Sequence, residues 1–180
     1  MLDKIAFKKL SQDATLPDRG HPDDAGLDIY AAETVILDPQ EKSLINTDLA
    51  VNIPKGYVGL LTSRSGVSSK TELVVETGKI DAGFIGHMKV SIKNDYVSLY
   101  EYDQAIRSTQ DGSTIYPIFN TKNEIIDYSN APDRPAYQIT KGDKIAQLVI
   151  VPIVTPEAVE VEEFTNTTAR GEQGFGSTGY

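Results

Sequence analysis

Short runs of β-branched and aromatic residues, separated by Gly, Pro, Asp and Asn, limit the fold of this 180-residue chain more than any other feature. Runs of this kind, bounded by turn residues, are typical of strands. The runs that we expect to be strands are residues 5–9, 34–37, 46–53, 57–62, 73–76, 88–93, 146–154 and 159–164. No segment keeps the 3.6-residue period of a long helix. The pattern therefore predicts an all-β sandwich, jelly roll or barrel.

Three segments add detail to this prediction. The run 146–154 is almost wholly apolar, so it should be a central buried strand with Pro152 near its end or at a bulge. One short helix is expected after Ser65, around residues 66–70. Residues 95–138 hold six of the nine tyrosines and three prolines, with no clean period. We expect this segment to be an insertion or small subdomain between two core strands.

Composition excludes several classes of protein. The length fits one domain, and 39% hydrophobic residues are enough for a core. A net charge of −9 argues against nonspecific nucleic-acid binding, although a few local arginines can still hold a free nucleotide. Without cysteine there is neither a disulfide nor a thiolate metal site. No signal peptide and no apolar run of about 20 residues is present, so we expect a soluble intracellular protein that binds no membrane.

The segment 170–180, Arg-Gly-Glu-Gln-Gly-Phe-Gly-Ser-Thr-Gly-Tyr, has the residues of a nucleotide lid. Glycines expose backbone N–H groups that can bind anions. Arginine matches phosphate oxygens, and a phenylalanine ring can stack on a base. No helix follows in the sequence, which excludes P-loop and dinucleotide motifs. A disordered polar terminus fits the segment equally well.

Other polar segments have both a functional and an ordinary interpretation. Residues 63–66, Ser-Arg-Ser-Gly, could bind phosphate at a helix start or form a simple turn. Asp81, between glycines and near Phe84, could be a general base or an aspartate at a favoured position of a β-turn. Asp24 and Asp28 could bind Mg²⁺ directly or through water, or belong to a turn. Residues 141–147 predict a hairpin turn that enters a core strand. His21 and His87 have no acid beside them in the sequence, and we expect both to be surface or structural residues.

The order of these segments is more specific than any one of them. Five segments occur in sequence: residues 24–32, 63–66, 78–86 with Asn94, 141–148 and 170–179. This set closely resembles the five motifs of the trimeric dUTPases (deoxyuridine triphosphate nucleotidohydrolases). The resemblance covers both ends of the chain and leaves out only the 95–138 region. It implies a jelly-roll-like subunit in a homotrimer whose active sites are shared between subunits.

The resemblance also implies the activity, which is hydrolysis of dUTP to dUMP and pyrophosphate with Mg²⁺ as cofactor. Asp81 would activate the water that attacks the α-phosphorus. Phe84 would pack on the deoxyribose, and the 78–84 hairpin and Asn94 would read the uracil edge. The residues implied to bind substrate are Arg64, Ser65, Gly66, Gly78, Ile80, Phe84, Asn94, Gln147, Arg170, Phe175, Gly176, Ser177 and Thr178. Asp28 would hold Mg²⁺ through water, with the ion chelated by the three phosphates.

Three features depart from the family pattern. Phe84 stands where tyrosine is usual, which keeps the ring and removes the hydroxyl. Glu172 and Gln173 replace small residues in the last motif. The 95–138 segment is much longer than the usual connection, an arrangement that resembles the dUTPases of staphylococcal phages. This resemblance implies a phage-encoded protein in the bacterial cytoplasm that also binds a pathogenicity-island repressor, whereas a passive surface insertion is the alternative.

The resulting division of the chain has three parts: a β core of residues 1–94 and 139–166, an insertion of residues 95–138 and a C-terminal lid of residues 167–180. Two other functions stay open. One is a dCTP deaminase of the same fold, and the other is a non-catalytic regulatory protein that senses dUTP.

Overall fold

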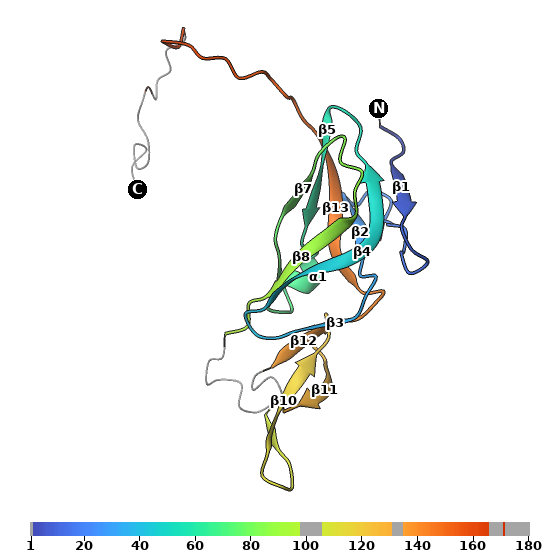
Figure 1. Cartoon of the computed structure of the whole chain (residues 1–180), viewed down its shortest axis with the longest axis vertical. Coiled ribbons are helices and arrows are strands. Elements are labelled where there is room, and N and C mark those ends of the chain that lie inside the picture. The colour runs from blue at the N-terminus through green and yellow to red at the C-terminus, as the bar shows by residue number, and fades with distance from the viewer. Residues whose placement is uncertain (1, 98–105, 131–134, 166–170, 172–180) are drawn as a thin grey trace.

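The computed structural model describes residues 2–97, 106–130, 135–165 and 171, and they are almost entirely β structure (Figure 1). The elements are β1 (Ala6–Lys9), β2 (Gly26–Tyr30), β3 (Val35–Leu37), β4 (Lys42–Asn52), β5 (Tyr57–Thr62), α1 (Ser65–Ser68), β6 (Leu73–Val75), β7 (Gly78–Ile80), β8 (Met88–Asn94), β9 (Arg107–Ser108), β10 (Thr114–Phe119), β11 (Ile125–Ser129), β12 (Ala136–Ile139) and β13 (Lys144–Pro152). The all-β fold class predicted from the sequence is confirmed. Within the described part of the chain, no helix is long or apolar enough to cross a membrane.

Two four-stranded sheets form the core. One has the strand order β1-β4-β8-β6 and the other the order β2-β13-β5-β7. Alternating residues of β4 and β8 point inward and are buried against β13 and β2, which gives one hydrophobic cluster. Its largest fully buried side chains include Ile29, Ile45, Leu49, Val90 and Leu148. Each such side chain contributes about 1.5–3 kcal/mol of transfer free energy, so this core fixes the strands that carry the site.

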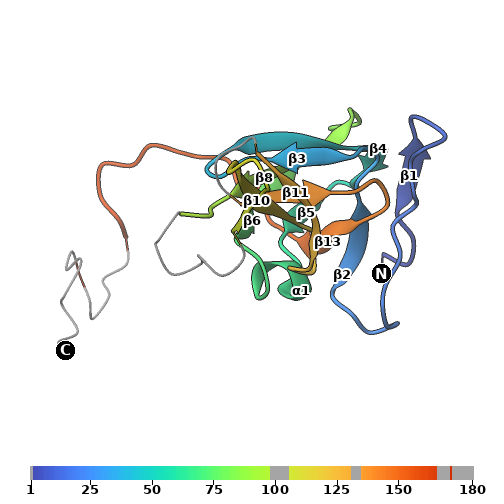
Figure 2. The same cartoon turned by 90° about the horizontal axis from the view of Figure 1, so that it is seen from below.

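A third sheet, with the order β11-β10-β12-β3, lies at one end of the two-sheet core, and β9 pairs with β10 beside it (Figure 1). Figure 2 views the molecule from this end. The inner strand β12 pairs antiparallel with β3, and its Tyr137 and Ile139 enter the main core. The 95–138 segment therefore contains a small sheet. Its strands were missed because β11 is mostly exposed, and none of β10, β11 and β12 alternates regularly between buried and exposed residues.

Several local predictions can be checked against these elements. The central strand is confirmed as β13, which ends at Pro152, and the short helix is confirmed as α1. The strand predicted at 159–164 is wrong, because residues 153–164 form no strand and are exposed along their whole length. In Figure 1 this segment leaves the body of the molecule. Its apolar residues alternate, but a strand also needs a neighbouring strand to pair with.

Candidate active site

Strand β13 brings together segments that are far apart in the sequence. It lies between β2 and β5, and Gln147 stands opposite Asp28 on one side and Thr62 on the other. Arg64 follows two residues after Thr62 and immediately precedes α1. Three of the predicted motifs, around Asp28, Arg64 and Gln147, therefore converge at one end of this sheet.

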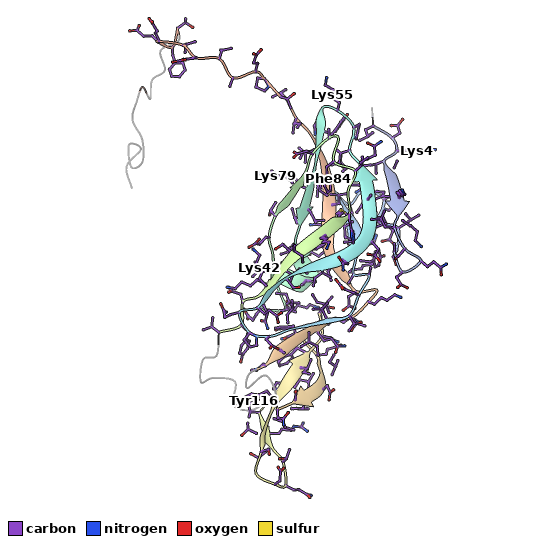
Figure 3. All side chains as sticks on the ribbon, in the orientation of Figure 1. Lys4, Lys42, Lys55, Lys79, Phe84 and Tyr116 are labelled. Atoms are coloured by element: carbon purple, nitrogen blue, oxygen red, sulfur yellow. The ribbon has the colours of Figure 1, made fainter. Side chains whose placement is uncertain are left out.

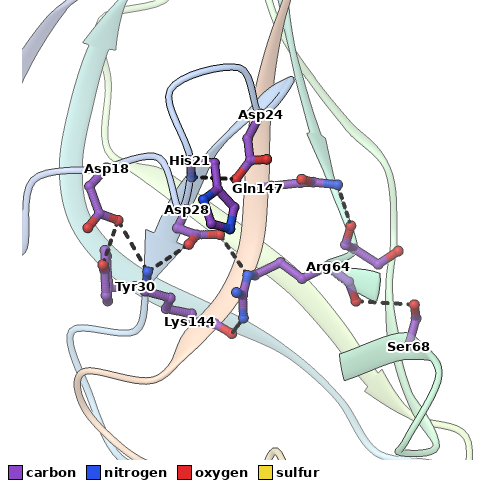
Figure 4. Close-up of polar contacts among 10 residues, drawn as sticks. Asp18, His21, Asp24, Asp28, Tyr30, Arg64, Ser68, Lys144 and Gln147 are labelled. Atoms are coloured by element: carbon purple, nitrogen blue, oxygen red, sulfur yellow. Dashed lines mark hydrogen bonds and ion pairs between the residues drawn. The ribbon is translucent and has the colours of Figure 1, made fainter. Parts of the chain in front are cut away.

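Asp28 is the centre of the polar network at this end (Figure 4). Its side chain is mostly buried, and each carboxylate oxygen accepts a bond from a cation. Arg64 donates from Nε to Oδ1 at 2.7 Å, and Lys144 donates from Nζ to Oδ2 at 2.7 Å. Arg64 also donates from Nη1 to the backbone carbonyl of Lys144 at 3.2 Å. One carboxylate thus holds two cations in place, and the Arg64 guanidinium keeps further N–H donors for an anionic ligand.

A second layer of bonds holds Lys144 itself. Tyr30 donates from Oη to Asp18 at 2.7 Å, and Lys144 lies 3.4 Å from the same Asp18 oxygen. The Tyr30 hydrogen bond and Lys144 lower the pKa of Asp18, whereas desolvation and the bond to Asp18 raise the pKa of Tyr30. The hydrogen bond to Asp28, with a smaller effect from Tyr30, raises the pKa of Lys144. Lys144 therefore stays charged, and Asp18 stays ionised, across the physiological range.

A cavity of about 380 Å³ opens beside this network. Small-molecule sites commonly measure about 300–1,000 Å³. The residues that line the cavity are Gly20, His21, Asp24, Ala25, Gly26, Asp28, Arg64, Ser65, Gly66 and Gln147. Ser65 and Gly66 open α1, where the first amide groups have no partner inside the helix. Gln147 donates from Nε2 to the Ser63 carbonyl at 3.0 Å, which fixes its amide at the rim. The cavity can thus offer a guanidinium, a hydroxyl, an amide and backbone N–H groups to an anion.

Gly26 makes room for Gln147, and we expect the Gly26→Ala variant to disturb both stability and the cavity. A Cβ at position 26 would stand 2.5 Å from Gln147 Oε1 and 2.9 Å from Gln147 Cβ. Overpacking of this kind typically costs about 1–3 kcal/mol. Thermal unfolding measures the loss, and Gly66→Ala, whose Cβ would meet nothing within 4 Å, is the control for stability. Equal stability of the two variants would contradict the tight contact.

The segment carrying Asp81 forms a turn between the two core sheets. The Phe84 amide donates to the Asp81 carbonyl at 3.1 Å, and Gly83 has φ +95°, a conformation that glycine adopts without strain. The chain then enters β8 in the opposite sheet, so the predicted 78–84 hairpin is wrong. Asp81 is exposed, and Phe84 is 48% exposed. Figure 3 labels Phe84 among the side chains of the chain. Gly86 leaves space for that ring, since a Cβ there would lie 2.8 Å from it.

Asp81 does not line the cavity of its own chain. Strand β7 pairs antiparallel with β5, with Gly78 opposite Leu61 and Ile80 opposite Gly59. Asp81 therefore lies towards the start of β5, whereas Arg64 lies beyond its end. Six or so residues of strand separate the two positions, which corresponds to roughly 20 Å. Within the described chain, the cavity lined by Arg64 and the turn that carries Asp81 therefore lie at opposite ends of β5.

The uracil-reading role expected for Asn94 is not supported by the structure. The Asn94 side chain is fully buried at the end of β8. Its Nδ2 donates to the Leu37 carbonyl at 3.0 Å, and its Oδ1 accepts from the Tyr96 amide at 3.0 Å. Both ends of the amide are thus engaged by the backbone, where they join β3 and β8 to the start of the 95–138 segment. A buried amide satisfied in this way is a structural residue.

Comparison with known proteins decides the family. A family model described as dUTPase matches residues 12–110 and 125–179. The chain belongs to the dUTPase family. The stretch that the family model leaves out, residues 111–124, includes β10 and the turn that follows it.

Two dUTPases with curated sequences illustrate the likeness. The deoxyuridine 5'-triphosphate nucleotidohydrolase of Mycolicibacterium gilvum is 36% identical over 185 residues, which cover 99% of this chain and 97% of that protein. The probable deoxyuridine 5'-triphosphate nucleotidohydrolase of Schizosaccharomyces pombe is 34% identical and covers 96% of each chain. Relatives as distant as these share the full length of the chain.

Solved dUTPase structures resemble the chain more closely. The Staphylococcus bacteriophage 80alpha dUTPase, solved with dUPNHPP, is 51% identical, with a TM-score of 0.82 and 99% of each chain covered; it is described within a study of phage dUTPases that control transfer of virulence genes. The dUTPase of phage phi11 of S. aureus, described as showing a species-specific insert, is 51% identical, with a TM-score of 0.76 over 92% of this chain and 100% of that one. A D95N mutant of the phi11 enzyme is described as showing the coordination of a structural Mg(II) ion, at 50% identity, a TM-score of 0.77 and coverage of 91% and 100%.

The remaining predicted site residues of this dUTPase fall into two groups. Gly78 is half-buried and Ile80 is buried in β7, so only their backbone can meet a ligand. Arg170, Phe175, Gly176, Ser177 and Thr178 lie outside the described residues. The resemblance placed these five residues in a lid, and that assignment stays a prediction.

Sequence reasoning missed several residues that the dUTPase fold brings into the site. Lys144, Asp18 and Tyr30 were not singled out, because the register of β13 with β2 brings Lys144 opposite Tyr30 and a separate backbone bridge brings Asp18 to Asp28. No acid stands beside His87 in the sequence, but Asp48 of β4 lies beside it in space. The His87 Nε2 accepts the Asp48 amide at 2.9 Å and lies 3.3 Å from the Asp48 carboxylate. His87 thereby ties the end of the Asp81 segment to β4, which is the structural role predicted for it.

Proposed function

We propose that this chain hydrolyses dUTP to dUMP and pyrophosphate by attack of water on the α-phosphorus. The observation that carries the proposal is the convergence of Asp28, Arg64 and Gln147 on one cavity in a chain that belongs to the dUTPase family. Phosphoryl chemistry depends on charge neutralisation and on an aligned nucleophile. The cavity would provide the first, and the exposed carboxylate of Asp81 would provide the second.

The phosphates would bind at the cavity beside Asp28. Arg64, held by Asp28 and by the Lys144 carbonyl, would present its remaining guanidinium donors to phosphate oxygens. Ser65, Gly66 and Gln147 would add a hydroxyl, a backbone donor and an amide. Because Arg64 and Gln147 are already fixed by hydrogen bonds to the protein, they would need little reorganisation as negative charge moves onto the leaving pyrophosphate.

In the proposed reaction, one bond to the α-phosphorus forms as another breaks. Asp81 would accept a proton from the water whose oxygen forms the new bond to the α-phosphorus. The bond between the α-phosphorus and the bridging oxygen would break, and pyrophosphate would leave with that oxygen. General-base assistance of this kind contributes about 10²–10⁴-fold.

A second copy of the chain would complete the site. Asp81 lies roughly 20 Å from Arg64 along the same sheet, by strand geometry. Phe84 is a large exposed ring next to that carboxylate, as expected for a surface that meets a ligand or a neighbouring subunit. We therefore propose a homotrimer in which the turn of residues 81–84 from one copy faces the phosphate cavity of another.

Mg²⁺ fits this site when it arrives with the triphosphate. Among the described residues no three His, Cys, Asp or Glu side chains are grouped as a metal site. Asp28 already accepts hydrogen bonds from two cationic side chains. A carboxylate has about four acceptor positions, so Asp28 can still accept a bond from a metal-bound water. The ion would supply charge neutralisation on the phosphates. Asp28 would orient it through water, and Arg64 would remain the main protein cation on the phosphate chain.

Uracil would be selected by the backbone of residues 78–84 in a pocket too small for a 5-methyl group. Cytosine would present a donor where the pocket also has a donor, which leaves buried polar groups unpaired. Sites that read a polar edge in this way reject analogues strongly, by about 10⁴–10⁵-fold in favourable cases. Steady-state kcat/KM values for dUTP, dTTP and dCTP test this, and similar values for the three nucleotides would exclude the proposal.

We also propose that the 95–138 segment binds a protein partner, a pathogenicity-island repressor. The phage 80 dUTPase is described as having SaPI-inducing capacity, and this chain is 50% identical to that structure. In this chain Ile125 and Ile126 of β11 are both nearly half exposed, and Val97 is exposed at the start of the segment. Exposed apolar residues on a small sheet suit a protein contact.

Deleting residues 98–134 and joining the ends through a short glycine linker should spare dUTP hydrolysis and abolish partner capture. The deletion keeps β12, whose Tyr137 and Ile139 belong to the main core. Gel filtration measures the oligomeric state, and dUTP hydrolysis and pull-down of the repressor measure the two expected effects. Ile125→Ser with Ile126→Ser is the milder companion variant. Undiminished capture by the deletion protein would place the contact on the core, and loss of hydrolysis would contradict the division into core and insertion.

A further inference from the structure

A second cavity, of about 340 Å³, is also lined by Arg64 and adjoins the nucleotide cavity. Three separate segments form it: α1 with the residues that follow it, the turn between β12 and β13, and the turn between β10 and β11. Its charged lining residues are Arg64, Lys70, Lys122, Asp143 and Lys144. Four cations thus face one carboxylate, in a chain whose net charge is −9.

Two of these cations form no ion pair within the described part of the chain. Arg64 and Lys144 are paired with Asp28, and Asp143 accepts the Thr121 hydroxyl at 3.2 Å and the Thr140 amide at 2.9 Å. Lys70 and Lys122 make no ion pair with any residue that the structure describes. Like charges gathered in one concavity raise the local concentration of anions. This pocket therefore has positive charge that the described residues do not fully balance.

The turn that carries Lys122 is held rigidly against the core. The Asn120 side chain accepts from the amides of Lys122 and Glu124 at 2.9 and 3.0 Å. The next residue along, Asn123, accepts the Tyr137 hydroxyl at 2.9 Å, and that same hydroxyl accepts the Glu72 amide at 3.3 Å. Tyr137 thereby ties the Lys122 turn to the segment that follows Lys70. The two lysines are presented by fixed backbone rather than by loose loops.

The pocket adjoins the nucleotide cavity. Arg64 and Gly66 line both, so the two cavities share one wall. Lysine ammonium groups with free donors bind phosphate oxygens as point charges. The Thr121 hydroxyl and the Gly142 backbone add polar groups to the lining. The chemistry of the lining matches a small multivalent oxyanion.

We propose that this pocket is a second anion site that binds inorganic pyrophosphate, separate from the site that holds the nucleotide phosphates. Lys122 from the insertion and Lys70 from the core would bind it from opposite sides, and Arg64 would form the shared wall. The site exists because the insertion turn closes it, which gives residues 120–123 a role distinct from protein binding. Pyrophosphate binding to this site can be measured without hydrolysis, since pyrophosphate can be added directly.

Calorimetric titration with pyrophosphate tests the site. The chain is first saturated with the non-hydrolysable analogue dUPNHPP, and binding of pyrophosphate is then measured in a buffer without phosphate. We expect about one further equivalent per chain, with affinity at least about 10-fold weaker in Lys70→Ala and in Lys122→Ala, as expected for loss of a charge-assisted hydrogen bond. Lys55→Ala and Lys89→Ala, which remove exposed lysines outside the pocket and outside the 78–84 segment, are the matched controls and should bind as the unmodified chain does.

The outcomes are separable from those of the proposed activity. Hydrolysis of dUTP at low product concentration is measured on the same variants and should be unchanged in Lys70→Ala and Lys122→Ala. Absence of pyrophosphate binding to the analogue-saturated chain would overturn the proposal, as would equal binding by all four lysine variants. Binding of an aspartate-rich peptide with no binding of pyrophosphate would also overturn it, because the pocket would then be a protein contact.

Discussion

The Asp81→Asn variant should bind dUTP with nearly the affinity of the unmodified chain and turn it over about 10²–10⁴-fold more slowly. The amide has the shape of the carboxylate but cannot take the proton of the attacking water. Asp81 is exposed and starts a turn whose bond uses only its backbone carbonyl, so the substitution should not disturb the fold. Single-turnover kinetics with dUTP and Mg²⁺ measures the chemical step directly.

Asp127→Asn is the matched control for this experiment. Asp127 is also an exposed aspartate, but it lies in β11, away from the cavity and from the Asp81 turn. It should leave turnover unchanged. A normal kcat for Asp81→Asn would assign the base to another residue, and loss of dUTP binding would show that the carboxylate has a binding role instead.

Removing residues 170–180 should reduce turnover severely, by about 10²-fold or more if the segment closes the site against water. The fold should survive, because residues 153–165 are already exposed and form no strand within the chain. Phe164, close to the truncation point, is 89% exposed, so the core ends well before residue 170. Thermal unfolding and steady-state dUTP hydrolysis measure the two effects separately.

A shorter truncation provides the control for the lid. Removal of Gly179 and Tyr180 alone keeps Arg170, Phe175 and the Ser-Thr pair, and it should retain most of the activity. Phe175→Ala should raise the KM for dUTP and leave the unfolding temperature nearly unchanged. Full activity of the 170–180 truncation would contradict the lid, and failure of the truncated chain to fold would show that the segment supports the core.

The parts of the fold that the sequence predicts correctly are those with a buried face. β13 and β5 have apolar or alternating sequences because they pack in the core, and such sequence patterns can be recognised as strands. The strand predicted at 159–164 shows the opposite case. Its alternation is as regular as that of a core strand, but no strand of the described chain lies beside it. Pairing depends on the position of a neighbour, which a single run of residues does not encode.

The site follows the same rule. Asp28, Arg64 and Gln147 could be selected from local motifs because each sits in a distinctive short segment. Lys144 and Asp18 could not, since their importance comes from the register that places Tyr30 opposite Lys144. Asn94 shows how a motif can mislead, because its amide type is right for reading a base while its position at the buried end of β8 uses both of its polar atoms.

Hydrolysis of dUTP in ¹⁸O-labelled water tests the central claim most directly. With Mg²⁺ present, the account predicts one ¹⁸O atom in each dUMP and none in pyrophosphate, as measured by mass spectrometry, and no ammonia from dCTP. Label in pyrophosphate would place the attack on the β-phosphorus and contradict the proposed geometry. Tight dUTP binding without any labelled product would instead identify a non-catalytic sensor, and deamination of dCTP would identify a different enzyme.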